Sequence, residues 1–539
     1  MEGATFAVGA LPWRAITRER SRSLTRALAG AVALGALLVL SAFLRTRALS
    51  VYYWIDEGLS VGIASHHFLA IPGVLRQDGS PPLYYMLLHL WMGVAGSGER
   101  ATHALSLIIG LATVPAALWA GWSLFGARCG WLCASFAALN PFLSAYAQET
   151  RMYELVVLLA LLATAAFLHA FVFGRRRYIP MVSVTLAALL YTHNWGLFLG
   201  IGMAAALGLG LIGGDRRRLL VDGALAFGGA ALLFAPWLPT LAFQARHTGA
   251  PWALAPTWRA AQDIPRTLLG KLPEILTVLF VAGAGVVLAL RREVESLTGD
   301  RPRPLERRAL QMAIVILGGA VLSAWLFSKV SPAWAARYFA LFLGPLLLVV
   351  GRGLARARGA GIAAMVVLAV LWGLLVHVPN RDAKSNVGVI ARVLTPRLHP
   401  GDVILATHPE EVPVLHRYLP ASVSFATPLG PVPDPAVMDW RDALARLRRA
   451  RVATNLEPLL DRMPVGSRIA IVFPIIRSSS QWRAPWTRLV RRRSTQWTQT
   501  LAHDPRFVPL SEVPGRYAHT RTHVGAGAIL YLKRNPIHA

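Results

Sequence analysis

Long apolar segments, separated by short polar gaps, fill the first 380 residues of the chain. A helix of this length and composition can cross a hydrocarbon core of about 30 Å. The segments lie near residues 27–44, 102–124, 130–146, 152–173, 178–192, 195–213, 219–242, 272–290, 309–328, 338–351 and 359–377. The pattern predicts a mainly α polytopic membrane protein with about eleven transmembrane helices.

One apolar stretch, Leu83–Ala95, is shorter than the others. Stretches of this length are more often interfacial than spanning. Counting it as a span would also put Asp56 and Arg151 on opposite faces of the membrane. We therefore expect it to lie at the membrane surface, inside a long first external loop that extends from Arg45 to Arg100.

Arginine is concentrated in alternate gaps between the apolar segments. The Arg-rich gaps are 14–26, 175–177, 216–218, 291–308 and 352–358. Cytoplasmic loops of membrane proteins carry an excess of Lys and Arg, so these gaps predict a cytoplasmic face and a cytoplasmic N-terminus. The other gaps are then expected at the extracytoplasmic surface of the plasma (inner) membrane.

The sequence beyond Asn380 changes to mixed polar residues with Pro-Gly turns. Strand-like runs occupy 402–407, 468–476 and 526–532, and a helical stretch covers Trp440–Arg451. This pattern predicts a soluble α/β domain at residues 380–539 after a transmembrane domain at residues 1–379. The last span exits outward, so we expect an extracytoplasmic domain, and we assign it no catalytic role.

Composition excludes the ordinary soluble classes. The 539 residues are 55% hydrophobic and 15% charged, with a mean hydropathy of +0.48. The net charge of +28 could indicate nucleic-acid binding, but the arginines cluster at segment ends, which topology and anionic lipid headgroups explain better. The two cysteines, Cys129 and Cys133, lie near a predicted cytoplasmic helix end, which favours packing over a disulfide or a zinc site.

The outward-facing gaps carry the polar residues that could perform chemistry. Asp56 and Glu57 follow the aromatic run Tyr52–Trp54 directly after the first span. Two carboxylates at the headgroup level could supply a general base and a partner that orients an incoming hydroxyl. A solvated loop pair is the alternative interpretation.

Further candidates lie in other external turns. Glu149 and Arg151 occupy a turn between two apolar segments, where a charged side chain is costly unless it is paired or functional. They are therefore either functional or part of a structural salt bridge. His193 could bind phosphate, transfer protons or cap a helix. Arg337 lies in an external gap, whereas the arginine-rich gaps are predicted to be cytoplasmic. This exception favours phosphate recognition by Arg337 over snorkelling of its side chain to the lipid headgroups. Lys329 lies in the same loop and could share that role.

Several common catalytic motifs are absent from the sequence. It has no Gly-rich phosphate loop, no nucleotide-binding fingerprint and no G-x-S-x-G motif. An outward-facing enzyme cannot use cytoplasmic nucleotide sugars, so an activated group would have to arrive on a lipid. A polyprenyl phosphate would fit an apolar groove between spans with a cationic outer lip.

Six short motifs, in order along the chain, resemble those of a known family. They are Trp54–Glu57, Ser80–Tyr85, Gln148–Tyr153, Tyr191–His193, Ala235–Pro239 and Arg337–Phe339. Together they are similar to motifs of the bacterial GT-C glycosyltransferases related to protein O-mannosyltransferases and to the aminoarabinose transferase of lipid A. The resemblance covers roughly residues 27–377 and is faint beyond residue 380.

The resemblance implies a GT-C fold with interfacial helices in the first external loop, and inverting sugar transfer from a polyprenyl phosphate. By position, Asp56 would take the proton of the acceptor hydroxyl, with Glu57 beside it. Arg337 and Arg151 would hold the donor phosphate. Tyr153 and His193 would line the sugar site, and we extend the candidate substrate-binding set to Asp78, Tyr84, Gln148, Glu149 and Tyr338.

Some enzymes of this fold coordinate a divalent ion, and Asp56 with Glu149 could do so here. We expect no obligatory metal or other cofactor, with Mg²⁺ or Mn²⁺ as the alternative. The expected partners are a polyprenyl-phosphate sugar, membrane lipids and an extracytoplasmic glycan, lipid or protein acceptor. The alternative functions are a transporter or lipid flippase, or a non-catalytic cell-envelope assembly subunit. Polar residues at one surface and the lack of a repeat favour an enzyme.

Overall fold

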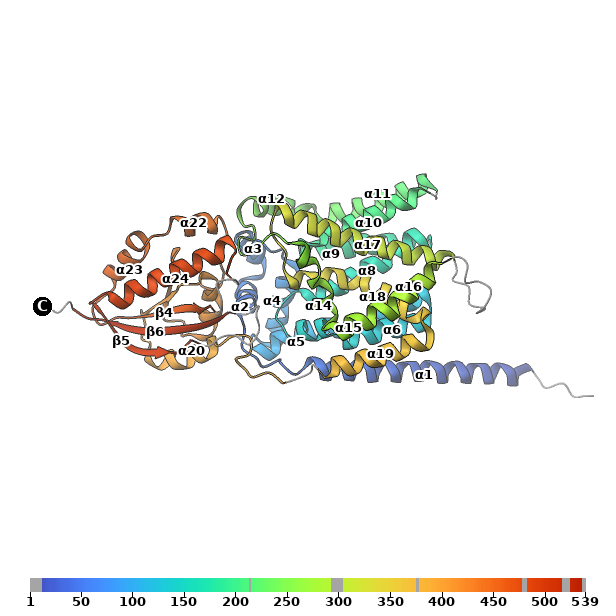
Figure 1. Ribbon diagram of the computed structural model, residues 1–539, viewed down its shortest axis with the longest axis horizontal. Coiled ribbons are helices and arrows are strands. Elements are labelled where there is room, and N and C mark those ends of the chain that lie inside the picture. The colour runs from blue at the N-terminus through green and yellow to red at the C-terminus, as the bar shows by residue number, and fades with distance from the viewer. Residues whose placement is uncertain are drawn as a thin grey trace, which may run out of the picture.

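The computed structural model describes residues 12–212, 215–291, 304–374, 378–476, 482–515 and 524–535. The molecule is elongated, with a bundle of helices at one end and a sheet with its own helices at the other (Figure 1). Most of the basic gap predicted at 291–308 lies outside the described residues, as do the last residues of the segment predicted at 359–377.

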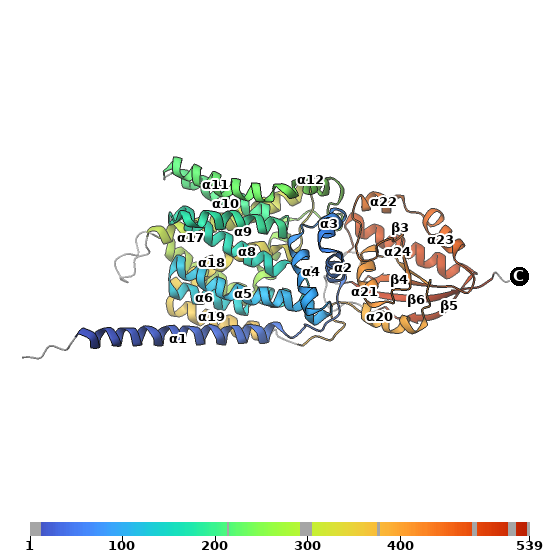
Figure 2. The ribbon, with the colours of Figure 1, turned by 180° about the vertical axis from the view of Figure 1, so that it is seen from behind.

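The bundle consists of helices that run along the long axis of the molecule (Figures 1 and 2). They are α1 (Pro12–Arg45), α5 (Glu99–Phe125), α6 (Ala127–Leu139), α8 (Tyr153–Phe167), α9 (Ile179–Thr192), α10 (Gly196–Leu211), α11 (Arg216–Phe234), α15 (Leu272–Thr277), α16 (Gly283–Leu290), α17 (Pro304–Val330), α18 (Ala340–Arg356) and α19 (Arg358–Gly373). A helix satisfies its backbone hydrogen bonds internally, which a hydrocarbon environment demands.

Seven helical stretches among the described residues are long and apolar enough to cross a membrane. They are Thr25–Arg45, Glu99–Phe125, Tyr153–Val172, Arg216–His247, Leu272–Leu290, Pro304–Val330 and Ala336–Arg356. The other predicted segments correspond to the shorter helices α6, α9, α10 and α19. A membrane location is therefore supported, while the number of about eleven spans stays a prediction.

The segment between α1 and α5 folds into three short helices at the end of the bundle that faces the sheet (Figures 1 and 2). They are α2 (Ile55–Ala64), α3 (Ile71–Asp78) and α4 (Leu83–Ala95). The chain bends by 117° between the stretches Ile55–Ala64 and Phe68–Asp78. Helix α4 has 13 residues, whereas a transmembrane helix needs about 20.

The described residues of the C-terminal part form one sheet of six strands in the order β3-β2-β1-β4-β6-β5. The strands are β1 (Val403–Ala406), β2 (Ser424–Thr427), β3 (Gly430–Pro431), β4 (Arg468–Ile475), β5 (Phe507–Val513) and β6 (Gly525–Lys533). Strand β1 is parallel to β2 and β4, and the other pairs are antiparallel. The flanking helices are α20 (Val387–Leu394), α21 (Val412–Tyr418), α22 (Ala443–Arg449), α23 (Glu457–Arg462) and α24 (Pro485–His503). All three predicted strands are confirmed.

Helix α2 connects the bundle to the sheet region. A Cβ atom on Gly58 would lie 2.6 Å from the Cα of Val414 in α21, so the two helices approach as closely as only glycine permits. Nearby, Tyr418 of α21 donates a hydrogen bond to Glu99 (2.9 Å) and accepts one from the backbone N–H of Tyr53 (2.9 Å). The first loop therefore packs between the bundle and the C-terminal part.

Candidate active site

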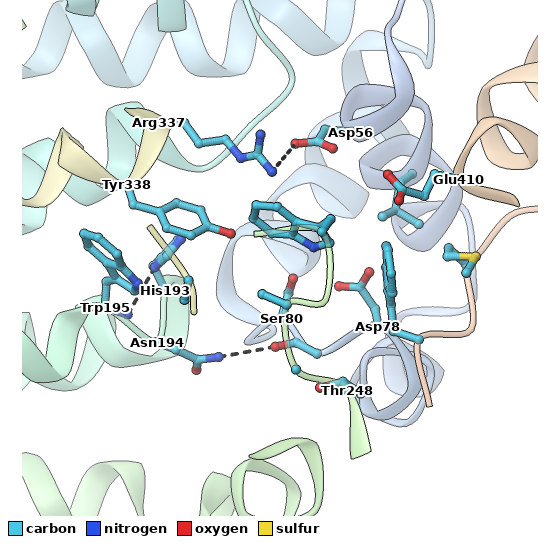
Figure 3. Close-up of a pocket in the computed structure, with 18 of the residues that line it drawn as sticks. Asp56, Asp78, Ser80, His193, Asn194, Trp195, Thr248, Arg337, Tyr338 and Glu410 are labelled. Carbon is cyan, nitrogen blue, oxygen red and sulfur yellow. Dashed lines mark hydrogen bonds and ion pairs between the residues drawn. The ribbon is translucent and has the colours of Figure 1, made fainter. Parts of the chain in front are cut away.

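A cavity of about 820 Å³ lies where the bundle, the first loop and the C-terminal part meet. Its wall combines α2, the turn after α3, the turn between α9 and α10, the segment before α18, and residues of the sheet region (Figure 3). Predicted site residues that line the cavity are Asp56, Asp78, Arg151, His193, Arg337 and Tyr338. Sequence elements far apart in the chain thus converge on one space.

Asp56 stands in the first turn of α2 and faces two arginines. Its Oδ2 atom lies 3.6 Å from Nη2 of Arg337 and 3.7 Å from Nη2 of Arg151. The side chain of Asp56 is 15% exposed, so it remains reachable from the cavity. One carboxylate and two guanidinium groups leave a net positive charge at this place, which favours an anionic ligand.

Both guanidinium groups are held in place by the protein. Arg151 donates from Nη1 to the backbone oxygen of Asp56 (3.2 Å) and to Oγ of Ser60 (2.9 Å). The guanidinium carbon of Arg337 lies 4.8 Å from the ring centre of Trp252 and 5.8 Å from that of Trp54. Stacked and hydrogen-bonded arginines lose little freedom when they bind a phosphate, which favours binding.

Glu57 does not line the cavity, although it follows Asp56 directly. It is fully buried, and its Oε1 atom accepts hydrogen bonds from His103 Nε2 (2.6 Å), Lys384 Nζ (2.9 Å) and the backbone N–H of Thr150 (2.9 Å). We call these four residues the Glu57 node. Burial alone would raise the pKa of Glu57, but Lys384 and His103 lower it well below its ordinary value.

The Glu57 node joins four distant segments directly behind Asp56 and Arg151. Glu57 neighbours Asp56 in α2, and Thr150 neighbours Arg151 in the turn before α8. Lys384, from the segment between α19 and α20, also donates to the backbone oxygen of Gln148 (2.6 Å). The node therefore connects the segments that carry Asp56 and Arg151. Glu57 is buried and does not line the cavity, so its predicted role beside Asp56 stays a prediction.

His193 lies in the turn between α9 and α10 and lines the cavity. Burial and the nearby Arg151 and Arg337 lower the pKa of His193 to about 3. Its Nδ1 atom accepts a hydrogen bond from the backbone N–H of Trp195 (3.1 Å), so the neutral ring carries its proton on Nε2. His193 is thus a neutral hydrogen-bond donor towards the cavity rather than a cation for phosphate.

Five other predicted site residues lie outside the cavity wall. Tyr84 is buried, with its hydroxyl 3.3 Å from that of Ser106. Lys329 is exposed, with its Nζ atom 4.6 Å from the ring centre of Trp325. Gln148 and Glu149 are buried in the turn before α8, and Tyr153 lies behind the wall, with its ring 6.4 Å from that of Tyr338. Their predicted direct contacts with substrate therefore lack support from the geometry.

The C-terminal part contributes side chains that sequence reasoning missed. His408, Glu410, Trp440 and Trp482 all line the cavity. No motif marks them, because they come from short connecting segments whose approach to the bundle depends on the fold. We assigned residues 380–539 no catalytic role from the sequence, and the geometry adds that side chains of this part line the cavity.

The predicted alternative of a divalent ion at Asp56 and Glu149 does not fit the donor set. Asp56 faces two guanidinium groups, and Glu149 does not line the cavity. Burial, together with the nearby Glu57 and Asp56, raises the pKa of Glu149 to about 7 despite Lys384. Within the described ranges, no group of three or more His, Cys, Asp or Glu side chains could hold a metal ion.

Comparison with known proteins gives matches at the level of structure. No family model and no curated protein matches the chain. Its structure is similar to that of ArnT from Cupriavidus metallidurans in the apo state, with a TM-score of 0.58 and 13% identity over 94% of this chain and 98% of that chain. The structure of ArnT bound to undecaprenyl phosphate matches with the same TM-score and identity over 93% and 98%.

A second similar structure is the arabinofuranosyltransferase AftD from Mycobacteria. It matches with a TM-score of 0.52 and 14% identity over 94% of this chain and 40% of that chain. At such identities the similarity establishes architecture, and ArnT and AftD are both GT-C glycosyltransferases. The chain therefore has the GT-C fold, a helical membrane bundle with a small C-terminal sheet, as the motif series predicts.

Proposed function

We propose that the protein transfers a monosaccharide from a polyprenyl-phosphate carrier to an acceptor hydroxyl, with inversion at the anomeric carbon. The observation that carries this proposal is the contact of Asp56 with Arg151 and Arg337 in a cavity at one end of the bundle. The similarity to ArnT bound to undecaprenyl phosphate supports a lipid-phosphate carrier.

The arginines would bind the phosphate of the donor. As the bond between the anomeric carbon and the phosphate oxygen breaks, its electron pair stays on the departing lipid phosphate. The increased negative charge is stabilised by Arg337 and Arg151, which are already oriented by Trp252 and Ser60. Each charge-assisted hydrogen bond of this kind contributes about 1.5–3 kcal/mol.

Asp56 would act on the acceptor. The acceptor oxygen attacks the anomeric carbon from the side opposite the phosphate, and its proton passes to the carboxylate of Asp56. His193 would donate a hydrogen bond from Nε2 to the sugar, and Tyr338, whose ring lies 4.6 Å from that of His193, would pack beside it. Glu57 and Lys384 act by positioning and touch no substrate.

The orientation in the membrane belongs to the same proposal. The arginine distribution predicts that the cavity faces the extracytoplasmic side, where lipid-linked donors replace nucleotide sugars. The C-terminal part would then lie outside the membrane, against the first loop. Cysteines introduced at exposed positions such as Glu457 and Arg217 should react with an impermeant label from opposite sides of the membrane.

A donor panel tests the proposal. Purified full-length protein is incubated with polyprenyl phosphates that carry different hexoses and pentoses, together with an envelope extract as a source of acceptors. Mass spectrometry follows release of the lipid phosphate. We expect one productive donor, and absence of release from every donor would contradict the proposed transfer.

A further inference from the structure

The cavity has a second polar end that the proposed reaction does not use. Its wall includes the side chains of Asp78, Gln244 and Glu410. Asp78 and Glu410 lie on the side of the cavity away from His193 and Tyr338 (Figure 3). Glu410 comes from the C-terminal part, Gln244 from α12 (Leu238–His247) and Asp78 from the end of α3. We call these three residues the acceptor end.

Glu410 is anchored by charge but keeps hydrogen-bonding capacity. Its Oε1 atom lies 3.7 Å from Nε2 of the buried His408, whose Nδ1 atom lies 3.5 Å from Oε1 of Glu411. Burial would lower the pKa of His408, but Glu410 and Glu411 raise it to about 10. The Glu410 side chain is 17% exposed and lines the cavity, so part of the carboxylate stays open to a ligand. A carboxylate held in this way accepts hydrogen bonds from a ligand.

Gln244 provides a second hydrogen-bond acceptor at the same end of the cavity. Its Nε2 atom donates to the backbone oxygens of Leu75 (2.9 Å) and Ser80 (3.2 Å), which fixes the orientation of the amide. The residue is 2% exposed, and its Oε1 atom receives no hydrogen bond within the described part of the chain. An unsatisfied buried acceptor costs about 1–3 kcal/mol, which a hydrogen-bond donor from a ligand would offset.

Aromatic rings complete this end of the cavity. Trp440 and Trp482 are each 7% exposed and line the wall, with the ring of Trp482 lying 5.4 Å from that of His408. Asp78 is buried as well, and burial raises its pKa. Apolar ring faces beside several oxygen acceptors suit a molecule with apolar faces and many hydroxyl donors, which describes a sugar ring.

We propose that the acceptor end binds the hydroxyl groups of a carbohydrate acceptor, and that Glu410 is a specificity-determining residue for this acceptor. The inference rests on the proposed function, because a donor sugar at Arg337 and Asp56 leaves this end of the same cavity for the second substrate. It assigns the C-terminal part a direct contact with substrate. A protein acceptor is the alternative that the experiment distinguishes.

Direct binding tests the proposal without turnover. The probes are fluorescently labelled oligosaccharides from mannan, arabinan and glucan, a labelled delipidated envelope protein fraction, and undecaprenyl phosphate. They are titrated onto the full-length protein in lipid nanodiscs. We expect at least one oligosaccharide to bind, and Glu410→Gln to weaken that binding about tenfold. The affinity for undecaprenyl phosphate should change less than twofold.

A second variant and a control distinguish a loss of oligosaccharide binding from a folding defect. Glu410→Asp keeps the charge beside His408 but withdraws the carboxylate, and we expect it to weaken oligosaccharide binding with an unchanged Tm. Glu457→Gln, on the exposed surface of α23, should bind every probe as the unmodified protein does.

The remaining outcomes overturn the proposal. It fails if no oligosaccharide binds, if both Glu410 variants bind oligosaccharides as tightly as the unmodified protein, or if only the protein fraction binds. The two proposals can also fail separately. If no donor releases lipid phosphate but oligosaccharides still bind in a Glu410-dependent manner, the proposed transfer is contradicted and the carbohydrate site is supported.

Discussion

Asp56 and Arg337 form an ion pair, with 3.6 Å between Oδ2 and Nη2, although Asp56 follows the first bundle helix and Arg337 precedes α18 (Figure 3). The contact places a carboxylate and a guanidinium group on the same cavity. An acceptor hydroxyl and a donor phosphate can therefore be bound within reach of each other. This relationship supports a transferase more directly than any single motif does.

Arg337→Lys should weaken binding of undecaprenyl phosphate about tenfold. Lysine keeps the charge but loses the planar donor pair and the stacking on Trp252. Binding can be followed through the change in tryptophan fluorescence on titration with the lipid. Arg259→Lys, which alters an exposed arginine outside the cavity, is the matched control. Equal affinity of both variants would remove Arg337 from the phosphate site.

Lys384→Met should lower the stability of the protein by about 3–5 kcal/mol, because it leaves the buried carboxylate of Glu57 without its cationic partner. The loss would appear as a lower Tm in detergent. The double variant Glu57→Gln with Lys384→Met removes both charges and should recover part of the loss. If Lys384→Met is as stable as the unmodified protein, the Glu57 node does not contribute to the stability of the fold.

Glu149 should make stability depend on pH. Its folded pKa of about 7 exceeds the ordinary value of 4.5, so the folded state holds its proton more tightly than the unfolded state. Stability is therefore lost as pH rises from about 4.5 through about 7, by on the order of a few kcal/mol. Thermal unfolding of Glu149→Gln between pH 5 and pH 8 should show a flatter profile. An identical slope in both proteins would contradict this assignment.

Chelation should leave lipid-phosphate release unchanged. Asp56 faces arginines rather than further carboxylates, and Glu149 lies outside the cavity. The measurement is the release rate in excess EDTA after prior dialysis. Activity that disappears and returns with Mg²⁺ or Mn²⁺ would show that a divalent ion is required.

The sequence predicts the arrangement of the bundle and the meeting of Asp56, Arg151 and Arg337. Hydrophobic segments and arginine-rich gaps are long signals, and together they place these three residues at one end of the helices. The strands β1, β4 and β6 were also predictable, because each contains a run of apolar residues.

Side-chain direction was not predictable to the same degree. Asp56 and Glu57 are adjacent, but neighbouring residues in a helix point about 100° apart, so one faces the cavity and the other the interior. Lys384 lies in the irregular segment before α20, and Glu410 lies in a single 3₁₀ turn, Pro409–Glu411, so no periodic pattern fixes the orientation of either side chain.

The most direct test of the account compares Asp56→Asn with the unmodified protein in a single-turnover assay of lipid-phosphate release from the productive donor. Loss of the base should slow sugar transfer to the acceptor by about 10²–10⁴-fold while Tm and membrane insertion stay unchanged. Asp263→Asn, which alters an exposed carboxylate outside the cavity, should retain the full rate. A full rate in Asp56→Asn would contradict the role of Asp56 as the base.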